Sequence, residues 1–399
     1  MIAPLLLVSV PFLTALALAA LRSDQHAERI DRWVVTLALP LAIGLAAWTG
    51  GLDRLGLLSA VLVWTTAALA RWGRVTNGGT DASARAGTDG DDAEPGRLAG
   101  GGSGHGARAL EQVALGGLLL VCLNGGSPSV TVWAAVAVVV GVSMLGLGDT
   151  GLSPTPALPS LGGSRGMGIA PAGLLLAVFG TIAAPLHPLL GLGCQVIGLA
   201  ILLTLVPALL PVALPLLLRL GTEAGAPLIL AAGLAGLVLS TLPRALTAER
   251  GAVLGQIGLA AAAIGLGNAE GAFAALILLI LLTLTDTAAR LTDRTHPLAL
   301  LGLAGLPPLG TFAGLALVLP AIAGHAPWLL LICLPCLATS GWRLIRRATN
   351  RRAGPWTLRA LGWLPIAAVL ILGLLMPAPL ALWLRAALPP PALTTGPTR

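Results

Sequence analysis

The chain has 399 residues, of which 56% are hydrophobic and 10% charged, and its mean hydropathy is +0.92. A soluble domain carries about 25% charged residues, so this composition excludes a water-soluble globular fold. The net charge is +7, and all 23 basic residues are arginines, because the sequence contains no lysine. The arginines are scattered between apolar runs without interleaved aromatic residues, which argues against nucleic-acid binding. The composition indicates an integral membrane protein whose arginines contact lipid headgroups.

Continuous runs of Leu, Ala, Val, Ile and Gly recur along the chain. About 20 such residues cross a bilayer as a helix, whereas the strands of a membrane barrel would alternate polar and apolar residues. We therefore predict an all-α, polytopic transmembrane helical bundle of about 12 to 14 spans, with broken helices and inverted repeats. The predicted spans are 2–21, 33–50, 56–73, 109–124, 128–148, 168–189, 192–218, 224–242, 252–267, 271–288, 298–322, 326–342 and 359–386.

Three regions follow from this pattern. Residues 1–73 are predicted to hold N-terminal transmembrane helices, the first of which is a retained span because it lacks an Arg-rich start and a polar cleavage region. Residues 74–108 are a low-complexity mixture of Gly, Asp, Ser and Arg, which predicts a disordered polar loop. Residues 109–399 are predicted to form a second transmembrane helical domain.

The arginine-rich segments test the number of crossings. If every predicted span crosses once, the basic segments 22–32 and 74–108 lie on one side of the membrane. The basic segments 243–251, 289–297 and 343–358 then lie on the other side, which conflicts with the bias of Arg towards one side. A miscounted crossing within the proline-rich residues 168–220 would remove the conflict.

Asp286 is the deepest carboxylate in the predicted spans, and Arg290 follows it four residues later. An Asp and an Arg at this spacing share one face of a helix. One interpretation is a self-neutralised pair at the helix end, with Arg290 reaching the membrane interface. The other is a titratable carboxylate tuned by its arginine, because ionisable groups inside a membrane are expensive and usually functional.

Three further residues are proton-path candidates. Glu111 and Glu270 each begin a predicted span, where the helix dipole stabilises a carboxylate. His187 lies between two prolines, where an interfacial loop histidine is the alternative. Since arginine does not release its proton in a protein, a proton path here must use carboxylates, histidines or water. Three further acidic residues, predicted to be loop charges, are Glu223, Glu249 and Asp293.

The sequence contains no P-loop, nucleotide fingerprint, metal-ligand cluster or nucleophile constellation. Cys333 and Cys336 lie in an apolar run without a neighbouring His, which favours packing over a redox or metal role. We therefore expect no cofactor, no metal and no catalytic residue, and redox chemistry would belong to partner subunits.

The most specific segment is 298–314, with the order Leu-Ala-Gly-Leu-Pro-Pro-Leu-Gly-Thr-Phe. It resembles the "SLAG-[IL]-PP-x-x-GF" segment of the antiporter-like membrane subunits of complex I, Mrp antiporters and energy-converting hydrogenases. Residues 216–220 are similar to the "ALLRL" helix end of that family, and residues 242–258 to its "DLKRLLAYSSIGQ" segment. Residues 271–291 take the place of its "HALFK" helix, so the resemblance covers about 180–350.

The resemblance implies a proton-translocating scaffold built on broken helices. Prolines within residues 168–220 also predict breaks on physical grounds, since proline removes a helical hydrogen bond. Broken helices inside a membrane line cavities and are typical of ion pathways. The predicted helix-break residues are Pro207, Pro211, Pro307, Pro308 and Gly310.

The family relays protons along a mid-membrane row of lysines, and this chain has none of them. Where the resemblance places the lysines, the sequence has Gly314-Leu315, Asp286 and a position at or near Pro211. Glu111 is the nearest counterpart of the family's early glutamate, by order along the chain.

Two interpretations follow: a relay through Asp286, His187 and water, or a non-conducting structural subunit. The resemblance implies translocation of protons or cations, coupled to redox chemistry in other membrane and peripheral subunits. The alternatives are that structural subunit, or an unrelated secondary transporter. The expected surroundings are a lipid bilayer, specifically a bacterial inner membrane.

Overall fold

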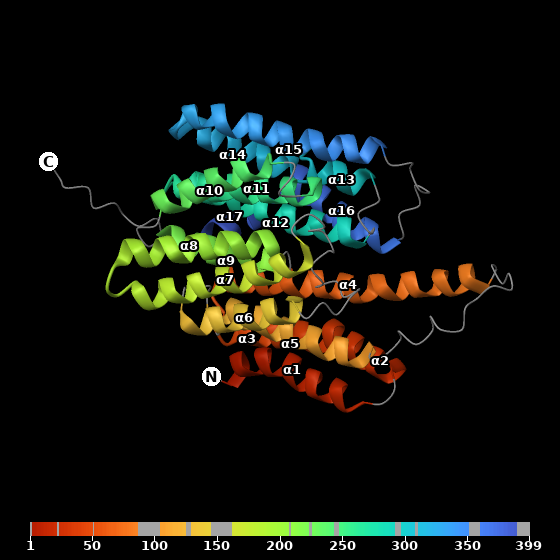
Figure 1. Cartoon of the computed structure of the whole chain (residues 1–399). Coiled ribbons are helices and arrows are strands. Elements are labelled where there is room, and N and C mark those ends of the chain that lie inside the picture. Colours follow the sequence, from red (N-terminus) through yellow and green to blue (C-terminus); the bar gives the residue numbers. More distant parts are fainter. Residues whose placement is uncertain are drawn as a thin grey trace.

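The structure of the protein is a computed structural model. Its described residues are 2–21, 24–50, 52–86, 104–124, 129–144, 162–206, 209–222, 226–242, 247–291, 297–307, 310–350 and 360–388. Within these ranges the chain is helical apart from turns and short connections, and no strand occurs there. The prediction of an all-α bundle is confirmed (Figure 1).

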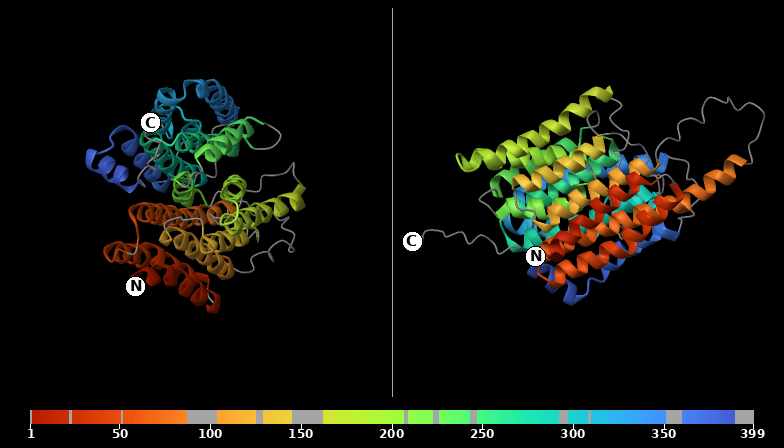
Figure 2. Two further views of the ribbon diagram at one scale, coloured as in Figure 1. Left: turned by 90° about the vertical axis from the view of Figure 1, so that its left-hand side faces the viewer. Right: turned by 90° about the horizontal axis from the view of Figure 1, so that it is seen from below.

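The helices pack side by side into one elongated bundle, seen along and across its length in Figure 2. Their order is α1 (Ile2–Ala20), α2 (Asp24–Trp33), π-helix η1 (Val34–Ala38), α3 (Leu39–Trp48), α4 (Arg54–Ala86), α5 (Gly104–Leu123), α6 (Val130–Met144), α7 (Gly162–Ala183), α8 (Pro188–Leu205), α9 (Leu210–Thr222), α10 (Ala226–Ser240), α11 (Ala248–Gly265), α12 (Ala269–Leu291), α13 (Pro297–Leu303), α14 (Phe312–His325), 3-10 helix η4 (Pro327–Leu329), α15 (Leu330–Asn350), α16 (Ala360–Leu374) and α17 (Ala378–Ala387).

Four helical stretches are long and apolar enough to cross a membrane: His26–Trp48, Arg54–Trp72, Ala269–Leu291 and Pro327–Thr349. The first is α2, η1 and α3 run together without a break. A bent pair, Leu364–Leu374 and Ala378–Ala387, passes the same test together and turns by 90°. Seven shorter apolar helices of 10–17 residues complete the set found among the described residues. The count of 12 to 14 spans therefore stays a prediction.

The predicted polar loop at residues 74–108 is partly helical. Helix α4 continues to Ala86 and α5 begins at Gly104. Residues 87–103 lie outside the described residues, so the disorder predicted for the loop is not tested there.

The chain reverses direction between α8 and α9, within the region where a miscounted crossing would remove the conflict in the arginine pattern. Helix α8 starts from its hairpin with α7, at the left end of the bundle in Figure 1. Arg219, near the end of α9, forms an ion pair with Asp53, just before the start of α4 at that same end. Hence α8 and α9 are not the single span predicted for 192–218.

As a result, the described helix ends that adjoin the basic segments lie at one end of the bundle, which we call the arginine-rich end. Helix α2 begins there, and α4 and α15 finish there, on the right of Figure 1. Arg343 donates to the Ser240 carbonyl at 3.2 Å and Arg347 pairs with Glu249 at 3.4 Å, so α10 ends and α11 begins beside the end of α15. A short turn joins α11 to α12, which returns to the same end. This asymmetry matches the bias of Arg towards the cytoplasmic side.

The second break separates α13 from α14. Helix α13 ends at Leu303, and Gly305 and Gly310 in the connection adopt positive φ values of 75° and 59°. A glycine supplies this conformation without steric cost. The Thr311 N–H donates to the Gly302 carbonyl at 3.3 Å, which satisfies an acceptor left open by the break. The helix is thus interrupted between Leu303 and Phe312, the region of the predicted break residues Pro307, Pro308 and Gly310, of which Pro308 lies outside the described residues.

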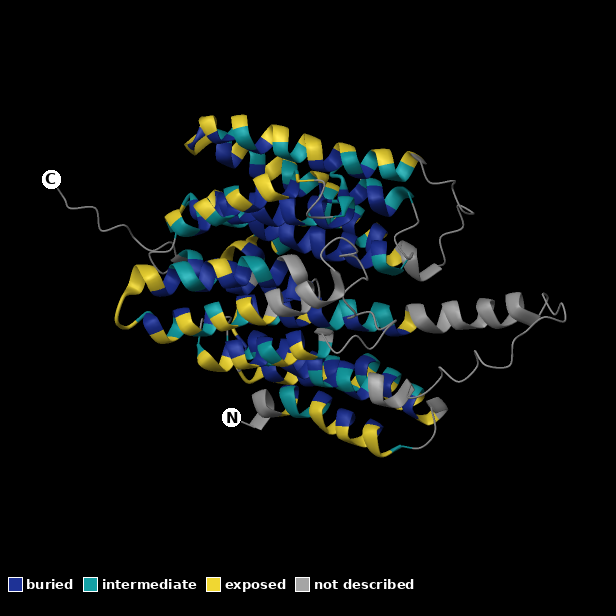
Figure 3. Ribbon diagram, in the orientation of Figure 1, coloured by how far each residue is buried: buried dark blue, intermediate teal, exposed yellow. Residues whose placement is uncertain are grey.

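Small residues allow the helices to approach closely. A Cβ added to Gly233 of α10 would lie 2.6 Å from the Gly258 carbonyl oxygen of α11. In a membrane no hydrophobic driving force brings helices together, so their association depends on close van der Waals packing of this kind. Figure 3 shows the result: buried residues concentrate on α11 and α12 in the interior, while exposed ones follow the outer helices.

Candidate functional site

The most buried set of charges among the described residues joins helices α2, α4 and α5. Arg71 on α4 lies between Asp31 on α2 and Glu111 on α5, with Nε–Oδ2 at 3.3 Å and Nη2–Oε2 at 3.2 Å. The side chains of Asp31, Arg71 and Glu111 are 3%, 3% and 1% exposed. Gln112, fully buried beside Glu111, donates to the other oxygen of Asp31 at 2.5 Å. We call these four residues the Arg71 network.

Helical periodicity explains why these residues meet. Glu28 and Asp31 are three residues apart on α2, and Arg108 and Glu111 are three apart on α5. Residues at this spacing share one face of a helix. Each helix therefore carries one buried charge, Asp31 or Glu111, and one partly exposed charge, Glu28 or Arg108, on the same face. Arg71 lies where the apolar stretch of α4 ends, opposite both faces.

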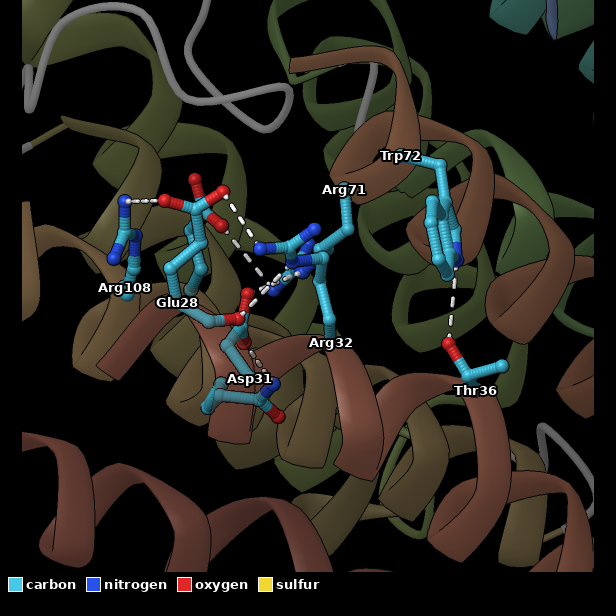
Figure 4. Close-up of polar contacts among 9 residues, drawn as sticks. Glu28, Asp31, Arg32, Thr36, Arg71, Trp72 and Arg108 are labelled. Carbon is cyan, nitrogen blue, oxygen red and sulfur yellow. Dashed lines mark hydrogen bonds and ion pairs between the residues drawn. The ribbon is translucent and has the colours of Figure 1, made fainter. Parts of the chain in front are cut away.

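A second layer of charges covers the network towards the arginine-rich end. Glu28 accepts from Arg32 at 3.2 Å and from Arg108 at 3.5 Å, and these three side chains are 23–36% exposed. Figure 4 shows Arg32 and Arg71 side by side between Glu28 and Asp31. We call Glu28, Arg32 and Arg108 the rim, because they separate the buried network from the outside of the bundle.

The helix that carries Asp31 is locally widened one turn further on. Residues Val34–Ala38 form a π-helix, which often marks functional sites because it leaves backbone carbonyls without their usual donor. Trp64 of α4 donates to the Val35 carbonyl at 2.8 Å, and Trp72 donates to the Thr36 hydroxyl at 3.2 Å (Figure 4). Two tryptophans thus fix this segment against α4, on the same side as Arg71.

Asp286 and Arg290 form the pair that their spacing predicted. The Nε and Nη2 atoms of Arg290 lie 2.8 Å and 2.5 Å from Oδ2 of Asp286. Asp286 is 4% exposed, whereas the Arg290 side chain is 22% exposed and sits in the last turn of α12. This geometry agrees with a pair at the helix end, whose arginine reaches the interface.

Glu249 corrects one prediction, because it is not a loop charge. Thr247 caps α11 by accepting from the Arg250 N–H at 3.4 Å, so the helix starts earlier than predicted and Glu249 lies in its first turn. Glu249 and Arg250 are 5% and 8% exposed, since the end of α15 covers them. Glu223 and Asp293 lie outside the described residues.

The other candidates occupy different places. Glu111 is two turns inside α5, too far from its N-terminus for the dipole interpretation, which applies within the first turn. Glu270 is exposed in the first turn of α12, where that interpretation fits. His187 is exposed and precedes α8 at the opposite end of the bundle from the Arg71 network. The structure therefore does not bring Asp286, His187, Glu111 and Glu270 together.

Of the predicted break residues, Pro211 is the second residue of α9, where proline fits because the first helical N–H groups have no partner. Pro307 and Gly310 lie in the connection after α13, and Pro207 and Pro308 lie outside the described residues. Among the described residues, no group of three His, Cys, Asp or Glu side chains is arranged to hold a metal ion.

Asp31 and Arg71 are the candidate site residues that sequence reasoning missed. Residues 22–32 had the charge of a loop, yet residues 24–33 are a helix that continues into the next span. The available signal was the spacing of Glu28, Asp31 and Val35, which continues one helical face into the apolar run.

Three solved structures share this fold. A chain of the Mrp complex from Dietzia sp. DQ12-45-1b is similar with a TM-score of 0.64 and 16% identity, over 97% of this chain and 51% of that one. A chain of the membrane-bound sulfane sulfur reductase, an archaeal respiratory membrane complex, has a TM-score of 0.63 and 13% identity over 96% of each chain. A chain of respiratory complex I from Thermus thermophilus with bound NADH has a TM-score of 0.57 and 16% identity, over 97% and 98%.

No family model and no curated protein matches the sequence. The chain spans about half the length of the Mrp chain and nearly the whole length of the other two. At these identities the similarity establishes the fold, and the predicted resemblance to antiporter-like subunits is confirmed at that level. The protein therefore has the fold of chains that belong to large membrane complexes.

Proposed function

We propose that the chain is a membrane subunit of a multi-subunit complex that translocates protons or cations, driven by redox chemistry in partner subunits of a bacterial inner membrane. The observation that carries this proposal is the Arg71 network, in which two carboxylates and an arginine are almost completely buried. Ionisable groups inside a membrane protein are costly to bury and tend to mark ion pathways. The shared fold with chains of three membrane complexes supports assignment to a complex.

The chemistry of the network suits a site that holds a proton. Arg71 stays charged, so Asp31 and Glu111 are the members that can bind a proton. Because Arg71 contacts both carboxylates, one of them can become neutral while the arginine keeps the other as its partner. The partly exposed rim, with Glu28 at its centre, provides the connection to the aqueous side.

A non-conducting structural subunit is the second candidate. It is favoured by the position of the charges, since both the Arg71 network and the Asp286–Arg290 pair lie towards one end of the bundle. Ion pairs placed there can anchor helix ends without conducting. An independent secondary transporter gains no comparable support from the three structures that share the fold.

The test uses the tagged full chain, purified with its native partners. Glu111→Gln and Asp31→Asn are compared with wild type for assembly on native gels and for proton uptake into inverted membrane vesicles. Each variant removes one protonatable group and leaves Arg71 a partner, so we expect normal assembly and a roughly tenfold or greater loss of proton uptake. Asp53→Asn is the control, since this carboxylate is exposed at the opposite end of the bundle.

Unchanged proton uptake in both variants, with normal assembly, would exclude conduction through the network and favour the structural role. Purification of the chain without any partner would contradict assignment to a complex.

A further inference from the structure

A second group of arginines lies at the end of α15, away from the Arg71 network. Arg343 and Arg347 on α15 contact Ser240 of α10 and Glu249 of α11, as described above. Arg250 lies next to Glu249, and Arg346 on the outer side of α15 is exposed. Three arginines, Arg343, Arg346 and Arg347, therefore lie on the last turns of α15, and Arg346 is the one exposed to the surroundings. We call Arg343, Arg346 and Arg347 the α15 arginine cluster.

An exposed apolar face leads directly into this cluster. Leu331, Leu334 and Trp342 recur on α15 at helical spacing, and their exposed fractions are 79%, 48% and 64%. Figure 3 shows exposed residues along the outer side of α15, which lies at the edge of the bundle. A tryptophan between an apolar surface and arginines is typical of the membrane–water interface.

The dimensions of this face match one leaflet. From Leu331 to Trp342 the helix rises about 16 Å at roughly 1.5 Å per residue. Half of the hydrocarbon core of a bilayer is about 15 Å thick. An acyl chain beside Leu331 and Leu334 would therefore have its phosphate close to Trp342 and the arginines.

We propose that the α15 arginine cluster binds the headgroup of an anionic phospholipid whose acyl chains lie along the outer face of α15. Guanidinium groups donate to phosphate through a planar fork, which suits arginine better than lysine for this contact. The contact of Arg343 with the Ser240 carbonyl and of Arg347 with Glu249 fixes the cluster in place. An acidic protein partner would use the charges but would not account for the apolar face beneath them.

The test measures lipid binding by the purified full chain, using native mass spectrometry with phosphatidylglycerol and phosphatidylcholine. Arg346 is the residue to change, because it is exposed and the contacts of Arg343 and Arg347 stay intact. We expect wild type to prefer phosphatidylglycerol, Arg346→Gln to bind it about fivefold less tightly, and Arg346→Glu roughly 25-fold less tightly. Arg29→Gln, an exposed arginine on α2, is the matched control and should bind like wild type.

Added salt should weaken phosphatidylglycerol binding by wild type more than by Arg346→Glu, because screening acts on the headgroup charge. Equal affinities for the two lipids, or unchanged phosphatidylglycerol binding by Arg346→Glu, would overturn the proposal. Loss of partner subunits from Arg346→Glu with normal lipid binding would instead assign the cluster to a protein partner. Lipid affinity is measured without proton uptake, so failure of this proposal and failure of the proposed function can be told apart.

Discussion

Replacing Arg71 with glutamine should be the most destabilising single change in the Arg71 network. The substitution removes the one cation that lies between Asp31 and Glu111, and the two carboxylates stay buried at 3% and 1% exposure. Gln112 still donates to Asp31, but an amide donor does not neutralise a charge. Both carboxylates must then bind protons or draw water into the bundle.

The expected magnitude follows from the burial of the pair. Removing one partner of a buried ion pair costs about 3–5 kcal/mol, because the other charge is left without compensation. Since Arg71 compensates two carboxylates, we expect the free energy of unfolding to fall by about 4 kcal/mol or more. Glu111→Gln should cost less than Arg71→Gln, because Arg71 then keeps Asp31 as its partner.

The assay is denaturant titration of the purified full chain in mixed micelles, followed by far-ultraviolet circular dichroism. Arg219→Gln is the matched control, since its ion pair with Asp53 is 32% and 41% exposed and such pairs contribute about 0–1 kcal/mol. A triple variant, Arg71→Gln with Asp31→Asn and Glu111→Gln, should recover most of the loss, because no buried charge is left unpaired.

A loss below about 1 kcal/mol for Arg71→Gln, similar to that of Arg219→Gln, would refute the reasoning, because it would mean that the network is hydrated. A triple variant as unstable as Arg71→Gln would also contradict it. In that case packing of the arginine stem, and not its charge, would stabilise the three helices.

Three further predictions concern other parts of the bundle. Asp286→Asn should assemble normally and slow proton uptake into vesicles if a relay passes through α12; unchanged uptake would leave the carboxylate a structural anchor. Gly310→Ala should destabilise more than Gly267→Ala in the same unfolding assay: both have positive φ, costing about 1–2 kcal/mol, but only at Gly310 would the new Cβ meet the backbone of α13. Trp64→Phe should cost about 1 kcal/mol, because it removes the hydrogen bond to the Val35 carbonyl in the π-helix; no loss would show that water replaces it.

Hydropathy predicted where most helices lie because a bilayer demands long apolar runs. The Asp286–Arg290 pair was also within reach, since both residues belong to one helix and their spacing fixes the contact. Asp31 and Arg71 were not, because they are 40 residues apart and their contact depends on how α2 packs against α4. Hydropathy scores Asp31 as a loop residue, whereas the charge is shielded by protein and never faces lipid.

The reversal between α8 and α9 is a second feature that hydropathy along the sequence did not predict. Composition alone merges residues 192–218 into one span, because prolines and leucines continue through the turn. The distribution of arginines supplied the missing information, since a single crossing there would have separated basic segments that belong on one side. Glu249 was misplaced for a third reason: the N-terminal turn of α11 is covered by α15, which lies about 100 residues later in the chain.

The absence of lysine limits how any ion path through this protein can work. A lysine in a buried site can lose its proton, whereas an arginine keeps its charge, so each basic residue here is a fixed cation. In the Arg71 network the positive charge is therefore constant, and a change of charge must occur on Asp31 or Glu111. Such a site lies close to one end of the bundle, beside the rim, so a proton held there exchanges with that end more readily than with the other. Conduction across the whole membrane would then require water or neutral polar side chains, such as the buried Gln256 of α11, to connect the network to the opposite end.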